Sequence, residues 1–112
     1  MNEKKLKLRD DEIKTIIDNG GSCVASDKIT VNGLVVGYMY REEPSFDTDN
    51  GWRFFSGTED QDYIDDPENS MIYDINTIAN YDAAIIPYLD LEIGSELERT
   101  NDNTFILLGN IN

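Results

Sequence analysis

The chain has 112 residues, of which 39% are hydrophobic, and this size and composition indicate one globular domain over residues 1–112 rather than a disordered segment. Its formal net charge is −14, with 23 acidic residues against 9 lysines and arginines. Such a surface excludes typical nucleic-acid and anionic-membrane binding, since both need clustered Lys and Arg, and it favours a basic protein partner.

The negative charge is unevenly distributed along the chain. Residues 1–41 carry seven Lys or Arg and six Asp or Glu, whereas residues 42–112 carry two Arg and 17 Asp or Glu. Two interpretations of this acidity stay open. It either steers a basic partner towards the protein or serves solubility alone.

The N-terminal part is expected to contain a helix followed by a strand. Residues 1–9 are basic with alternating leucines, which predicts a tail or a short edge strand. Asp10 suits a helix N-cap, and isoleucines at helical spacing follow it, so we predict a helix that ends at Asn19-Gly20-Gly21. Residues 22–25 then predict a short strand.

Two hairpins are predicted in the middle of the chain. Residues 29–31 and 34–41 flank Asn32-Gly33, which is the strongest short signal for a two-residue hairpin turn. Residues 37–57 predict a second hairpin with two aromatic strands, of which the first ends before Pro44. An acidic loop with the turn residues Asn50-Gly51 connects them.

The second half of the sequence predicts short strands and short helices separated by loops. A polar loop over 59–70 with one helical turn near 62–65 leads to an extended piece at 71–73. Asp74 and Asp82 suit the N-caps of short helices at 75–80 and 83–86, and residues 96–100 and 104–108 predict a last hairpin. The fold class is therefore α+β, with an antiparallel sheet of about five or six strands, an N-terminal helix and short crossover helices.

No set of catalytic or metal-ligating residues stands out. Cys23 is the only cysteine and there is no histidine, so no intrachain disulfide is possible, and zinc binding and a Cys–His nucleophile are disfavoured. Residues 47–51 lack the glycine and glutamate spacing of an EF-hand loop. We therefore expect no cofactor and no metal, although a hydrolase that uses paired carboxylates and a divalent metal stays a minor alternative.

Targeting and membrane signals are also lacking. The lysines near the N-terminus are not followed by the apolar stretch of a signal peptide. No apolar run approaches the roughly 18 residues needed to span a membrane. A cytoplasmic protein is expected.

Two arginines lie in the predicted 37–57 hairpin. Arg41 and Arg53 stand on its two strands, with several acidic residues in reach. A planar guanidinium binds carboxylates bidentately, so we expect both arginines to form structural charge pairs that hold the acidic loops on the sheet.

Several segments resemble one family of small bacterial proteins, first described as domain of unknown function 2185 and now as immunity protein 33-like. They are residues 37–44 (GYMYREEP), 49–59 (DNGWRFFSGTE), 73–82 and 85–89, together with Gly94-Ser95 and Glu98-Arg99. The resemblance covers about residues 20–100. Asn50 stands where the family motif has a serine.

The resemblance implies a cytoplasmic antidote of a polymorphic toxin system, and it brings no catalytic residues. We expect a non-enzymatic immunity protein that binds and neutralises a basic toxin domain; the alternative is a regulatory or ligand-binding domain without a toxin partner. The residues expected to contact the partner belong to the loops 42–50 and 59–68 or are aromatic anchors: Glu42, Glu43, Asp47, Asp49, Trp52, Glu59, Asp60, Asp62, Tyr63, Asp65 and Asp66.

Overall fold

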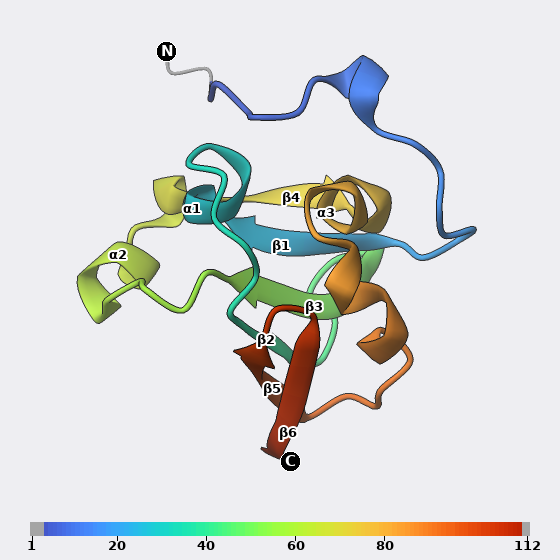
Figure 1. The fold of residues 1–112 in the computed structure, drawn as a ribbon, viewed down its shortest axis with the longest axis vertical. Coiled ribbons are helices and arrows are strands. Elements are labelled where there is room, and N and C mark those ends of the chain that lie inside the picture. The colour runs from blue at the N-terminus through green and yellow to red at the C-terminus, as the bar shows by residue number, and fades with distance from the viewer. Residues whose placement is uncertain (1–3, 111–112) are drawn as a thin grey trace.

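A six-stranded mixed sheet organises residues 4–110, the part of the chain that the computed structural model describes (Figure 1). The strands lie in the order β4-β1-β3-β2-β5-β6, and their bounds are β1 Ser22–Ser26, β2 Tyr38–Arg41, β3 Asp49–Phe55, β4 Ser70–Asp74, β5 Ser95–Asn101 and β6 Thr104–Asn110. The helices are α1 Asp27–Thr30, α2 Gln61–Asp65 and α3 Ile75–Tyr81, with 3₁₀ helices at Asp10–Glu12, Pro67–Asn69 and Ala83–Tyr88. The predicted α+β class is confirmed.

The sheet is not wholly antiparallel, which corrects the sequence prediction. The β1–β3 pair is parallel, whereas the four other pairs of neighbouring strands are antiparallel. The reason is the position of β2, which pairs with β3 on the side away from β1. The hairpin therefore returns the chain beside β1 in the same direction as β1.

The predicted 37–57 hairpin is confirmed as β2 and β3. Tyr38 lies opposite Phe55 and Arg41 opposite Trp52 in the antiparallel register. The loop between the strands spans residues 42–48, so Asn50-Gly51, predicted as its turn residues, lie within β3 instead. The C-terminal hairpin is also confirmed as β5 and β6, and it lies at the bottom of the view in Figure 1.

The core lies between one face of the sheet and α1, α3 and the 3₁₀ helix Ala83–Tyr88. From β2, β3 and β5 it receives alternate side chains, and from the helices it receives isoleucines, all at most 1% exposed: Met39, Trp52, Phe54, Leu97, Ile29, Ile75, Ile78 and Ile85. Because side chains alternate along a strand, Tyr38, Tyr40, Arg53 and Phe55 lie on the other face of the sheet. Cys23 is buried in the core, and burial raises the pKa of its thiol.

The predicted N-terminal helix is wrong. Residues 10–12 form one 3₁₀ turn, and the segment that follows is non-helical up to β1. Two side chains of α3 hold this segment: Asn76 Oδ1 accepts from the N–H groups of Ile16 (2.6 Å) and Ile17 (2.8 Å), and Asn80 bonds both backbone groups of Lys14. These side chains bind backbone groups that a helix would use for its own hydrogen bonds. Ile16, which the predicted helix would bury, is 49% exposed.

We expect Asn76→Ala to release this segment and to lower the free energy of unfolding by about 1–2 kcal/mol, because three hydrogen bonds to residues 16 and 17 are lost. Hydrogen exchange at the amides of Ile16 and Ile17 should accelerate more than exchange in β3. Thr77→Ala, on the same helix but outside this network, is the matched control. Equal effects of both substitutions would contradict this role of Asn76.

The predicted hairpin around Asn32-Gly33 is also wrong, since residues 27–30 form α1 instead of a strand. Ser26 Oγ accepts from the Lys28 N–H (3.1 Å) as N-cap, and Ile29 and Thr30 are fully buried. Gly33 has φ +81° and its N–H bonds to the carbonyl of Ile29 (3.0 Å). The glycine therefore ends a helical turn, which needs the same left-handed conformation as a hairpin turn. The residues before Lys7 form no strand among those described, although the Lys7 N–H bonds to the Thr30 carbonyl (2.7 Å).

Candidate functional site

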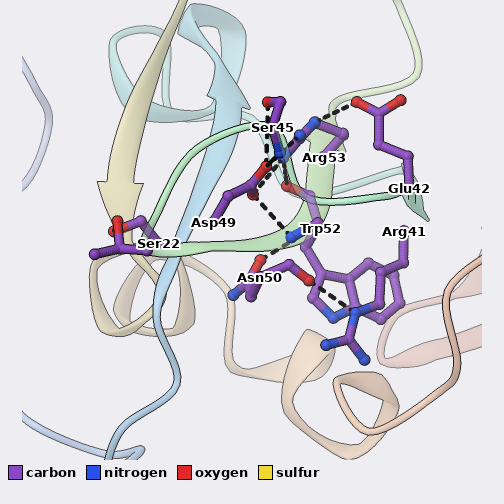
Figure 2. A network of polar contacts seen from close by, with 10 residues as sticks. Ser22, Arg41, Glu42, Ser45, Asp49, Asn50, Trp52 and Arg53 are labelled. Carbon is purple, nitrogen blue, oxygen red and sulfur yellow. Dashed lines mark hydrogen bonds and ion pairs between the residues drawn. The ribbon is translucent and has the colours of Figure 1, made fainter.

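The 37–57 hairpin contains a buried ion pair at the base of its loop (Figure 2). Arg53 donates from both terminal nitrogens to the two carboxylate oxygens of Asp49, at 2.9 and 2.7 Å. Its Nε donates to Glu42 at 2.6 Å. The side chain of Asp49 is 0% exposed and that of Arg53 is 7% exposed, whereas Glu42 is 48% exposed. One guanidinium thus holds both ends of the acidic loop against the sheet.

The remaining acceptor capacity of Asp49 is used by the loop itself. The N–H groups of Ser45 and Gly51 both donate to its carboxylate, each at 2.8 Å. The hydrogen bonds from Arg53, together with these backbone bonds, hold the pKa of Asp49 well below its usual range, although burial opposes them. Asp49 is expected from sequence to contact a partner, but in the structure it organises the loop from within.

Trp52 also lies inside the protein rather than at its surface. It is 1% exposed, its indole N–H donates to the Leu89 carbonyl (3.1 Å), and its ring lies close to that of Phe54. The alternation of β3 explains this position, because Trp52 shares the core face with Phe54. As a partner-binding residue Trp52 is therefore not accessible in this structure.

Arg41 differs from Arg53 in its partners. Its guanidinium donates to the carbonyls of Asn50 (2.8 Å) and Leu91 (2.7 Å) and lies 5.8 Å from the ring of Trp52. No carboxylate of residues 4–110 lies within 4.0 Å of it. Arg41 therefore ties β2 to the turns around it through backbone oxygens rather than through the expected charge pair (Figure 2).

The other predicted contact residues are in the two loops. Glu43 and Asp47 are exposed in the loop after β2. Around α2, exposed carboxylates accompany the partly exposed Tyr63 and Glu59: Asp60, Asp62, Asp65 and Asp66. Part of this second group is structural, since Asp60 and Asp66 are N-caps and Glu59 accepts from the N–H groups of Ser56 and Gly57, both at 2.9 Å. Despite burial, hydrogen bonds from Ser26, from Ser56 and from the backbone of Glu59 itself lower the pKa of Glu59.

Three aromatic side chains that sequence reasoning did not select form a cluster on the second face of the sheet. Tyr40 stacks on Phe55 with ring centroids 6.0 Å apart, and Tyr38 lies within 6.2 Å of both rings. All three are partly exposed. The Tyr38 hydroxyl donates to Glu96 on β5, and burial together with this hydrogen bond raises the pKa of Tyr38. Their strict alternation with Met39 and Phe54 is the sequence signal that identifies them.

A second ion pair connects distant parts of the chain. Arg99 donates to Asp82 and to the carbonyl of Val36 (2.8 Å), and Asp82 also accepts from the Val36 N–H at 2.9 Å. Both charged side chains are at most 12% exposed. This contact fixes the segment before β2.

Metal-binding clusters are lacking among the described residues, and the cavities differ in size. Within residues 4–110, no group of three His, Cys, Asp or Glu side chains is arranged to hold a metal ion. A cavity of about 260 Å³ beside Arg41 and Trp52 is smaller than the roughly 300–1,000 Å³ of typical small-molecule sites, whereas a hollow of about 580 Å³ lined by Lys4, Asp27 and residues 66–71 falls within that range. In the same part of the chain, the helices are all too short or too polar to cross a membrane.

Comparison with known proteins identifies the family. Residues 23–108 match the family model of the Immunity protein Imm33 domain. Searches among curated proteins and among solved structures find no match. The matched range contains the hairpin β2–β3, the Asp49–Arg53 pair and both acidic loops. It begins slightly after the resemblance noted in the sequence and extends further towards the C-terminus. The chain therefore belongs to the Immunity protein Imm33 domain family, whose description indicates a role in immunity to a toxin.

Proposed function

We propose that this protein is a cytoplasmic, non-enzymatic immunity protein that binds a basic toxin domain and neutralises it through an acidic surface. The acidic regions are the loop after β2 and the segment around α2, which lie at opposite ends of β3. The family assignment supports an immunity role and, in general, a toxin protein as partner.

One observation carries the choice of surface. The two loops expose a set of carboxylates that form no ion pair within the described part of the chain: Glu43, Asp47, Asp60, Asp62, Asp65 and Asp66. Uncompensated charges of one sign repel each other and raise the potential at the surface. A basic partner relieves this repulsion and is steered to the loops as it diffuses.

The Asp49–Arg53 pair supports the proposal in a second way. Because Arg53 bonds to Asp49 and Glu42, the loop after β2 is held in one shape before any partner arrives. A preorganised loop loses less conformational entropy when it binds. The buried pair therefore supports the binding surface without belonging to it.

The experiment measures association with the toxin domain encoded by the adjacent gene. We expect a variant with Glu43→Gln, Asp47→Asn, Asp62→Asn and Asp65→Asn to associate about tenfold more slowly at low salt, because steering depends on these charges. The matched control removes four exposed acids elsewhere: Asp10→Asn, Asp11→Asn, Asp18→Asn and Asp90→Asn. Co-expression must also protect cells from the toxin. Failure of the wild-type protein to bind or protect would refute the function, and equal slowing by both variants would refute the surface.

A further inference from the structure

The second face of the sheet, opposite the core, carries a surface patch that belongs to neither acidic loop. We name it the aromatic face, and it consists of side chains from four adjacent strands: Tyr38 and Tyr40 on β2, Phe55 on β3, Glu96 and Glu98 on β5, and Ile106 on β6. The register places Tyr38 opposite Phe55 and Glu98, Tyr40 opposite Glu96, and Glu98 opposite Ile106. These residues therefore form one continuous patch.

The aromatic face remains open to solvent. The core cluster takes the opposite side chains of the same strands, Met39, Phe54 and Leu97. On the aromatic face, Ile106 is 46% exposed, Glu98 is exposed and the three rings are partly exposed. Three mutually packed rings with one open side resemble the centre of a protein interface, where Tyr and other aromatic residues contribute most of the binding energy.

The charge on this face has one sign. Glu96 and Glu98 lie beside the tyrosines. Burial and, to a smaller extent, the negative charge of Glu42 raise the pKa of Tyr40. The one arginine on the same face of β3, Arg53, is 6% exposed and bonded to Asp49 and Glu42. No hydrogen bond within residues 4–110 uses the Tyr40 hydroxyl. The face thus combines ring surfaces and carboxylates without an available cation.

Such a combination suits a cationic side chain. A Lys or Arg is attracted to the face of an aromatic ring, and neighbouring carboxylates supply charge-assisted hydrogen bonds. The proposed acidic loops border the same patch, since Phe55 and Tyr63 line a common pocket and Glu42 follows β2 directly. A second copy of this chain fits poorly, because two such faces would bring carboxylates against carboxylates.

We propose that the aromatic face is the central contact surface for a basic protein partner, with a Lys or Arg of that partner placed over the Tyr40 and Phe55 rings. This inference rests on the proposed function, and it moves the centre of binding from the acidic loops to the sheet. The loops then steer the partner, and the aromatic face holds it.

The test compares Tyr40→Leu with Tyr40→Phe in binding to the toxin domain encoded by the adjacent gene. Tyr40→Leu removes the ring and is expected to increase the dissociation constant about tenfold or more, whereas Tyr40→Phe keeps the ring and should change it less than about threefold. Ile16→Ser is the control for general surface change, since Ile16 is an exposed apolar residue that bonds to α3 through its backbone N–H. Thermal unfolding of each variant establishes that it is folded.

The possible outcomes separate this inference from the proposed function. If the wild-type protein binds and Tyr40→Leu binds equally well, the aromatic face is not the contact surface and the inference alone is overturned. If the wild-type protein does not bind, the proposed function fails and the inference fails with it. If the free protein is a dimer in light scattering and Tyr40→Leu makes it a monomer, the face serves a second copy, which also overturns the inference.

Discussion

Replacing Arg53 by methionine is expected to lower the free energy of unfolding by about 3–5 kcal/mol, the typical effect of breaking a buried ion pair from one side. The substitution leaves the carboxylate of Asp49, which is 0% exposed, without a cation in the protein interior. It also frees Glu42 and removes the bond from Arg53 to the Trp52 carbonyl. Urea unfolding of the two proteins at neutral pH measures the difference.

Arg9→Met is the matched control for this prediction. Arg9 also pairs with two carboxylates, but its side chain is 76% exposed. Exposed pairs of this kind contribute about 0–1 kcal/mol, so the control should stay close to the wild-type protein. Similar losses for both substitutions would show that the buried Asp49–Arg53 pair contributes no more to the free energy of unfolding than an exposed ion pair does. A double variant, Asp49→Asn with Arg53→Met, should recover part of the loss because it no longer buries an isolated charge.

The same pair gives the stability a defined dependence on pH. The pKa of Asp49 is lower in the folded protein than in the unfolded chain, where it is about 3.9, so the folded state favours the ionised form. Its contribution is therefore fully present above the unfolded pKa and is lost as the pH falls from about 4 towards the folded pKa. In Asp49→Asn this part of the acid dependence should be absent.

The sequence predicted the fold well wherever a local signal agreed with the tertiary contacts. Asp74 and Asp82 cap the helices they were expected to cap, and the β2–β3 hairpin forms in the expected segment. Asn32-Gly33 failed because its signal is shared by two structures: a glycine with positive φ ends a helix as readily as it turns a hairpin. The N-cap at Ser26, three residues before Ile29, favours the helix over the hairpin.

The N-terminal segment failed for a different reason. The isoleucines after Asp10 have helical spacing, but asparagine side chains of α3, about 60 residues away in sequence, bond to the backbone of that segment. The sequence of the segment itself gives no indication that side chains so distant in sequence will bind its backbone.

The candidate site shows the same division between local and distant information. Both acidic loops were predicted from composition, and most of their carboxylates are exposed. The burial of Asp49 and Trp52 was missed because it depends on which face of β3 the core occupies and on the guanidinium of Arg53. Tyr38, Tyr40 and Phe55 were missed because an aromatic residue in a strand is usually assigned to the core. Alternation along the two strands places them opposite Met39 and Phe54, but it does not tell which of the two faces the core covers.

Gly51→Ala is expected to destabilise the protein by about 3–4 kcal/mol, because it adds two separate costs to one position. Gly51 has φ +89°, a conformation that costs an L-residue roughly 1–2 kcal/mol. A Cβ at this position would also lie 2.2 Å from the carbonyl oxygen of Glu42, so the start of the loop after β2 must move. That movement strains the loop in which Asp49 accepts the Gly51 N–H. Chemical denaturation measures the total cost.

Gly57→Ala separates the two costs of this prediction. Gly57 has nearly the same backbone conformation, φ +95°, but a Cβ there would meet no atom closer than 3.8 Å. This control should therefore lose only the conformational part, about 1–2 kcal/mol. If the two substitutions are equally destabilising, the close approach of Glu42 to Gly51 has no energetic consequence. A larger loss at Gly51 would show that β3 needs a glycine there for its close approach to Glu42 as well as for its positive φ.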